Sequence, residues 1–158
     1  MNPVKLSDHF SLAEAVMSNT ADRMHIDNTP DAVTITIMEL TATGMERVRA
    51  LLGNKPILIS SWYRSLQLNR ALNSKDTSQH PKGEAIDFIC PGFGSPLDIC
   101  KKIITNKDLI RYDQLILEHT WVHISFAIST GKPKAQVLSL LATGGYASGL
   151  TDKKGNPL

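Results

Sequence analysis

The chain has 158 residues, a formal net charge of +2 and 20% charged residues. This length suits one domain with a hydrophobic core, expected here over residues 1–150, with a mobile tail over 151–158. Lys and Arg are scattered along the chain, which argues against nucleic-acid binding. The opening Met-Asn-Pro-Val-Lys-Leu lacks the apolar core of a signal peptide, and no stretch is apolar enough to span a membrane. We therefore expect a monomer made in the cytoplasm, with no stable membrane insertion.

Helices are predicted mainly in the first half of the chain. Ser11 begins a capping-box pattern, and Ser65 and Ser95 are further candidate N-caps, the last followed by Pro96 at a first helical position. Apolar residues at three- and four-residue spacings predict a long helix that Gly53 ends. Helices are expected over about eight residues from Leu12, and over 31–52, 65–72 and 97–106.

Strands are predicted mainly in the second half. Short β-branched runs bounded by turn residues indicate them. Because helices precede strands, the fold class is α+β, with a small, mainly antiparallel sheet and helices packed on one side. The expected strands cover 56–61, 85–89, 114–118, 121–128 and 137–141.

The two cysteines, Cys90 and Cys100, are ten residues apart and lack the spacing of a zinc-binding pair. They could form one disulfide, but synthesis in the cytoplasm favours free thiols. We interpret them as buried packing residues.

Three residues have the chemistry of a metal site: His80, Asp87 and His123. Two imidazoles and one carboxylate leave a zinc ion one open position, which distinguishes a catalytic from a structural zinc. On one α-helix, His80 and Asp87 would lie about 10 Å apart along the axis, too far to share an ion. Pro81 and Gly83 also break any helix there. We expect His80 on a loop that doubles back into a strand carrying Asp87.

The alternation of residues along the strands predicts which way the ligands point. In the strand after Gly83, Asp87 lies on the opposite face to Ile86 and Phe88. In the later strand, His123 lies on the opposite face to Val122 and its apolar neighbours. Both ligands are therefore expected on the polar face of the sheet.

Glu118 is the candidate general base. If residues 119–120 form a two-residue hairpin loop, Glu118 pairs with Trp121 and Ile116 pairs with His123. Glu118 would then lie diagonal to His123, about 7 Å away between Cβ atoms. That position lets a carboxylate reach water at the metal without binding the metal. The His-Thr loop is a poor tight turn, however, because it offers no residue suited to positive φ.

Three more residues are candidates for substrate contact. Arg64, at a strand-to-helix turn, could recognise a carboxylate or carbonyl through its fork of N–H donors, or form a salt bridge. Ser78 could hydrogen-bond substrate or serve its own turn. Trp121 packs on the domain or lines the cleft.

Together these residues resemble the M15 zinc peptidases, the group of D-Ala-D-Ala carboxypeptidases and phage endolysins. The opening segments resemble the phage and prophage branch of that family. The matching motifs are Trp62-Tyr63-Arg64-Ser65, Ser78-x-His80-x-x-Gly83-x-Ala85-x-Asp87, Trp121-Val122-His123, Phe10-Ser11-Leu12-x-Glu14 and Ile26-Asp27-Asn28-x-Pro30.

The resemblance implies a hedgehog/DD-peptidase-like fold and one zinc ion bound by His80, Asp87 and His123. It also implies cleavage of peptide bonds in peptidoglycan stem peptides, with Arg64 on the substrate side. One position departs from many relatives, which have an acid three residues before the second histidine. Here that residue is Thr120, so Glu118 is the nearest acid and His119 is a second candidate for the catalytic role.

Several functions stay open within this reading. The enzyme could be a D-Ala-D-Ala carboxypeptidase, an endopeptidase that cleaves cross-links, or an L-Ala-D-Glu endopeptidase. A non-catalytic virion or tail protein that keeps the fold for wall binding is the alternative of another class, kept open by Thr120. Without a signal peptide, the protein would act on the wall after release by phage-type lysis, or on wall fragments.

Overall fold

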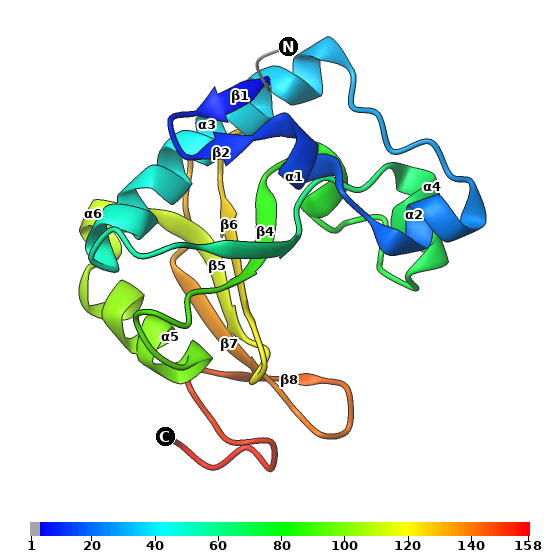
Figure 1. The fold of residues 1–158 in the computed structure, drawn as a ribbon. Coiled ribbons are helices and arrows are strands. Elements are labelled where there is room, and N and C mark those ends of the chain that lie inside the picture. The colour runs from blue at the N-terminus through cyan, green and yellow to red at the C-terminus, as the bar shows by residue number, and fades with distance from the viewer. Residues whose placement is uncertain (1–3) are drawn as a thin grey trace.

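The computed structural model describes residues 4–158, which form a six-stranded sheet, a two-stranded sheet and helices around them (Figure 1). The predicted α+β class is confirmed. The helices are α1 (Leu12–Val16), α2 (Asn19–Met24), α3 (Ala32–Leu51), α4 (Leu66–Ala71), α5 (Pro96–Thr105) and α6 (Lys107–Ile110), with the 3₁₀-helix η1 (His80–Lys82). The strands are β1 (Lys5–Ser7), β2 (Phe10–Ser11), β3 (Leu58–Ser61), β4 (Ala85–Ile89), β5 (Tyr112–Leu117), β6 (Val122–Phe126), β7 (Gln136–Leu140) and β8 (Tyr146–Ser148).

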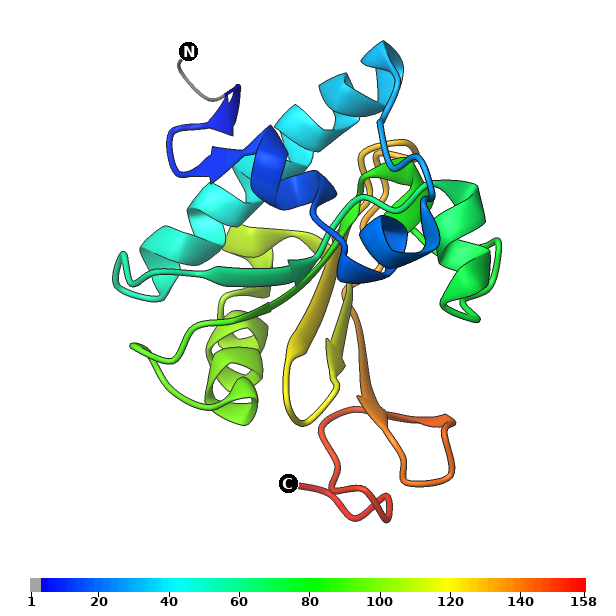
Figure 2. The same cartoon turned by 45° about the vertical axis from the view of Figure 1, so that its right-hand side comes forward.

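The main sheet has the strand order β3-β4-β6-β5-β7-β8. Every neighbouring pair is antiparallel except β5 and β7, which run parallel. The expected, mainly antiparallel sheet is therefore confirmed. Helices α3 and α5 pack on one face of this sheet, as both views show (Figures 1 and 2).

The main hydrophobic core lies between that face and the helices. Ile86 and Phe88 from β4 and Val122 and Ile124 from β6 are fully buried there. The alternating residues of the same strands point to the opposite face, which is polar. Because the apolar face is covered by helices, the chemistry-bearing side chains of the sheet are left on the other one.

Serine caps begin two of the predicted helices where the sequence indicated them. Ser65 and Ser95 accept hydrogen bonds from backbone N–H groups three residues on, and Ser95 forms a capping box with Asp98. Asp31 caps α3 in the same way. In this long helix, Thr41 donates to the Ile37 carbonyl, so its buried hydroxyl has a partner.

The first predicted helix is too long. Helix α1 ends at Val16 because Met17 is extended, and Ser18 caps a second short helix, α2, that was not predicted. Helices α2 and α4 lie side by side in both views, where Ala21 packs with Leu68 in a second, small core (Figure 2). The short elements β1, β2, α6 and β8 were also not predicted, and His80 begins a 3₁₀ turn rather than lying in a plain loop.

The last residues fold back on the chain. Thr151 is buried, pairs with Pro157 and donates its N–H to the Ser139 hydroxyl. The Leu158 N–H donates to the Leu150 carbonyl. The predicted mobility of residues 151–158 stays a prediction. No helix within residues 4–158 is both long and apolar enough to span a membrane.

Candidate metal centre

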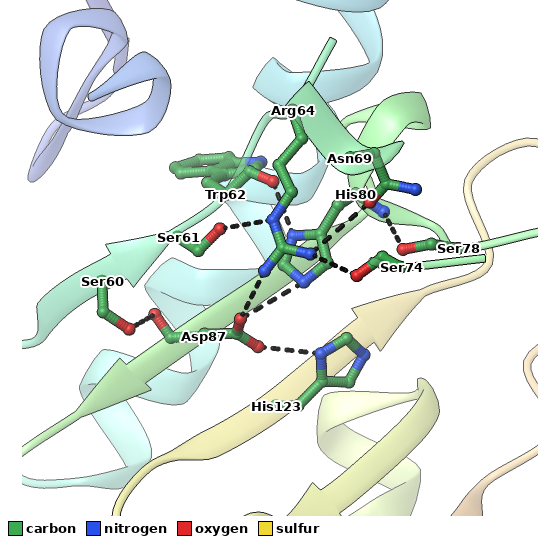
Figure 3. Close-up of polar contacts among 10 residues, drawn as sticks. All are labelled: Ser60, Ser61, Trp62, Arg64, Asn69, Ser74, Ser78, His80, Asp87 and His123. Carbon is green, nitrogen blue, oxygen red and sulfur yellow. Dashed lines mark hydrogen bonds and ion pairs between the residues drawn. The ribbon is translucent and has the colours of Figure 1, made fainter. Parts of the chain in front are cut away.

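Asp87 and His123 are direct neighbours across two central strands. Strand β4 pairs with β6 so that Asp87 lies opposite His123. The Nδ1 atom of His123 is 2.8 Å from Oδ1 of Asp87. The cross-strand pairing that the hydrophobic alternation demands therefore places a carboxylate and an imidazole together on the polar face (Figure 3).

His80 reaches the same carboxylate from outside the sheet. Its side chain is buried, and Nε2 lies 3.3 Å from Oδ2 of Asp87 (Figure 3). Its Nδ1 atom is 2.7 Å from the backbone carbonyl of Trp62. Because a carbonyl can only accept, Nδ1 carries the proton and Nε2 presents its lone pair towards Asp87. A partner of this kind orients a metal-binding histidine.

A glycine turn delivers His80 to this position. Gly83 ends η1 with φ of 77° and donates its N–H to the His80 carbonyl. A Cβ atom there would lie 2.6 Å from Cγ of Met38 on α3. Gly83 is thus required both by the left-handed backbone and by the close approach of α3. Its carbonyl accepts from the buried Trp62 indole, which closes the turn onto β3.

The three residues form a donor set that could hold a metal ion. One candidate ligand atom from each of His80, Asp87 and His123 lies within 4.8 Å of the others. Burial lowers the pKa of His80, which keeps its ring neutral. Burial opposes ionisation of Asp87, but its contacts with the two imidazoles, led by the hydrogen bond from His123, outweigh that effect and hold the pKa of Asp87 well below its usual range. A lone pair on Nε2 that faces a carboxylate suits a cation between them, and the donor set suits zinc.

Arg64 is held beside the candidate metal centre by four partners. Its Nε donates to Ser61, one Nη to Ser74 and Asn69, and the other Nη to Oδ2 of Asp87 at 3.3 Å (Figure 3). Four of its five N–H groups are thereby used. Arg64 therefore contacts a candidate metal ligand directly, an arrangement that the sequence did not reveal.

Glu118 lies on the polar face next to this cluster. The predicted hairpin register is confirmed, because Ile116 pairs with His123 and the Glu118 N–H donates to the Trp121 carbonyl. The two-residue turn forms because His119 takes a positive φ of 66°, the conformation that we expected this loop to lack. Burial raises the pKa of Glu118, the neighbouring His123 lowers it, and Asp87 raises it further.

His119 and Thr120 lie at the tip of the same hairpin. The Nε2 atom of His119 is 2.8 Å from the Leu140 carbonyl and therefore donates to it. The exposed Thr120, at the position of the expected acid, donates its backbone N–H to the Glu118 carbonyl. Glu118, two residues before Thr120, is the acidic side chain at this end of the hairpin.

A hollow of about 640 Å³ adjoins the cluster on the polar face. It runs from Ser74 and Ser78 on the loop before η1 to Ile116 on β5 and Tyr146 on β8. Two of its lining residues touch the cluster, since Ser74 bonds Arg64 and Ile116 pairs with His123, but none of the three candidate ligands lines the hollow itself.

Two of the predicted substrate residues are placed differently around this hollow. Ser78 lines it, and its hydroxyl also accepts from the His80 N–H. Trp121 is 36% exposed at the hairpin and does not line it. Tyr146 also lines the hollow and was not among the residues predicted from the sequence. Burial and the charges of Glu118 and Asp87 raise its pKa.

The comparison with family models agrees with this geometry. The model described as Peptidase M15 matches residues 8–125, which include His80, Asp87, Glu118 and His123. A comparison with curated proteins finds no match. Since the matched region covers most of the 158 residues, the chain belongs to the peptidase M15 family.

Proposed function

We propose that this protein is a zinc-dependent peptidase that hydrolyses peptide bonds in peptidoglycan stem peptides. The observation that carries the proposal is the meeting of His80, Asp87 and His123 within 4.8 Å in a chain of the M15 family. The adjoining hollow of about 640 Å³ supports it, because it is large enough for part of a peptide. The fragment bound there would continue along β5 and β7.

In this proposal each charged residue has one role. His80, Asp87 and His123 would hold the zinc ion, which when bound acidifies water and polarises a carbonyl. Glu118 takes the proton from the attacking water, since its carboxylate is raised in pKa and has no hydrogen-bond partner among residues 4–158. His119 is less suited, because its Nε2 is engaged with Leu140.

Arg64 would both hold a candidate metal ligand and contact the substrate. Its bonds to Ser61, Ser74 and Asp87 fix the guanidinium in one place. The remaining N–H on the Nη atom that bonds Asp87 can meet a substrate oxygen and stabilise its developing negative charge. Ser78, on the rim of the hollow, is a further proposed substrate contact, and Trp121 stays a weaker one.

The site of action is part of the proposal. We propose that the enzyme works on the cell wall after release from the cytoplasm, as an endolysin does, or on wall fragments. The hollow begins beside the candidate metal centre and reaches Tyr146, a length that supports a substrate of several residues, as an endopeptidase takes. A D-Ala-D-Ala carboxypeptidase would need less of this length.

The test combines metal analysis with digestion of purified muropeptides. We expect about one zinc per chain and, by mass spectrometry, defined peptide fragments. His123→Asn should lose both, whereas His25→Asn, at an exposed left-handed position that Asn tolerates, should keep both. Zinc-loaded wild-type protein that leaves all muropeptides intact would contradict the enzyme and favour the wall-binding alternative. The masses of the fragments identify the bond that is cut.

A further inference from the structure

Two arginines line a second, small hollow on the helix-covered side of the sheet. Arg47 from α3 and Arg111 from the α6–β5 turn border a space of about 180 Å³. The other walls come from the end of β6 and the loop after it: Phe126, Ala127, Ile128, Gly131 and Pro133. None of these residues belongs to the candidate metal centre.

Local packing brings the two arginines together. A Cβ atom at Gly44 would lie 2.7 Å from the Phe126 ring, so this glycine lets α3 approach the end of β6 closely. Arg47, three residues later, lies on the same face of the helix. It therefore lines the hollow beside the segment that follows β6. Arg111 ends α6 with φ of 57°, where its N–H donates to the Lys107 carbonyl.

The charges of this pair are not matched by the protein. The Nε atom of Arg47 is buried and has no hydrogen-bond partner among residues 4–158, and neither arginine makes an ion pair within that range. Burial, and then the charge of Arg111, lower the pKa of Arg47. A buried donor and a like-charge neighbour both cost stability unless an anion is bound. Asp108 lines only the adjoining hollow, together with Lys107 and Arg111.

We propose that Arg47 and Arg111 form a binding site for a doubly charged phosphate group. A single guanidinium fork satisfies a carboxylate, whereas two forks match a phosphate monoester, which carries about −1.5 to −2 charges at pH 7 and three acceptor oxygens. Gly131, on the wall of the hollow, has a φ of 66°, and a Cβ atom there would meet nothing within 4 Å. The hollow is therefore open on this side, where an anion can enter. The hollow is separate from the peptidase centre, so the site does not depend on the proposed activity.

The first experiment is an NMR titration of the zinc-loaded protein with inorganic phosphate at constant ionic strength, which keeps screening equal. We expect the Arg47 Nε–H signal and the Gly131 amide to shift together in a saturable way. Glycerol 3-phosphate, a dianionic ester, should act like inorganic phosphate. Dimethyl phosphate, a monoanionic diester, should bind at least tenfold more weakly. Shifts confined to the residues around His123 would overturn the proposal.

The second experiment compares arginine variants by the affinity for inorganic phosphate. Arg47→Gln and Arg111→Gln should each weaken binding at least tenfold. Arg23→Gln removes the same charge from an exposed residue on α2 and should change the affinity less than twofold. If Arg47→Gln does not fold, the exposed Arg111 decides the question. Unchanged affinity in Arg111→Gln, or an equal loss in Arg23→Gln, would show that no specific site exists.

Discussion

Two half-buried arginines on opposite sides of the sheet differ in what they contact. Arg64, on the polar face, donates to Ser61, Ser74, Asn69 and Asp87. Arg47, on the helix-covered side, has a buried Nε without a partner among residues 4–158. A paired charge of this kind organises its neighbours, whereas an unpaired one can still bind something from outside.

The same contrast applies to the two carboxylates of the polar face. Asp87 is contacted by His80, His123 and Arg64, and the contacts with the two imidazoles hold its pKa low despite its burial. Glu118 has no hydrogen-bond partner for its carboxylate among residues 4–158, and burial raises its pKa. We infer that the paired groups build the site and that the unpaired groups act on ligands. Five predictions test this difference.

The largest effect is expected at Asp87. Asp87→Ala leaves Arg64 and two imidazoles without their shared anion, so it should abolish metal binding and lower the free energy of unfolding by about 3–5 kcal/mol. Asp76→Ala, which removes the exposed partner of Arg70, should have a far smaller effect, because solvent screens that pair. Urea denaturation and metal analysis measure both. Equal losses in the two variants would contradict the organising role of Asp87.

The pH dependence of stability in the metal-free protein follows from the same carboxylate. The folded pKa of Asp87 is lower than its ordinary value of 3.8, so its contribution is present above that value. The stabilising contribution of Asp87 is lost as the pH falls below 3.8 towards the folded pKa. This loss should be absent in Asp87→Ala.

Glu118→Gln should give the next largest effect. Loss of a general base typically lowers kcat by about 10²–10⁴-fold, and zinc should be retained because Glu118 is not among the candidate metal ligands. Since the base must be ionised and burial raises its pKa, the acid limb of the kcat/KM profile should lie above pH 4.5. The exposed Glu39→Gln is the control. An unchanged rate in Glu118→Gln would assign the base elsewhere, with His119 the next candidate.

Arg64→Lys should have a smaller but measurable effect on catalysis. Lysine keeps the charge but cannot contact Ser61, Ser74 and Asp87 at once, so kcat/KM should fall about 10–100-fold. If the spare N–H of Arg64 acts only in the transition state, the fall appears in kcat rather than KM. Arg70→Lys, on the exposed α4 surface, should leave both constants unchanged. A change in KM alone would indicate ground-state binding instead.

Arg47→Met should have the smallest effect on stability. Methionine keeps most of the apolar stem and removes an unpaired buried donor, so the free energy of unfolding should change by less than about 1 kcal/mol. Arg64→Met should lose about 3 kcal/mol, because Asp87 and its other partners are left unmatched. Chemical denaturation of both variants compares them directly. A large loss in Arg47→Met would mean that Arg47 stabilises the fold through its own contacts.

Local signals in the sequence identified most of the frame around the site. Ser65, Ser95 and Asp31 are caps whose effect acts within one turn, so the helices that they begin were predicted within one or two residues. The alternation around Asp87 and His123 correctly separated core from polar face. The short pieces β1, β2, α2 and α6 have too few residues for a periodic signal. Strand β1 and helix α6 are held by contacts with α3, and α2 by the packing of Ala21 against Leu68.

The sequence by itself determined which residues could bind a metal and which face of each strand they occupy, because side-chain chemistry and strand alternation are local properties. Only the tertiary structure decided that Trp62 orients His80, that Arg64 bonds Asp87, and that Arg47 meets Arg111. These pairs join residues from different elements, and their contacts depend on how closely the elements approach. Gly83 and Gly44 leave room for α3 to approach η1 and β6, but packing across the whole domain decides which elements come together there.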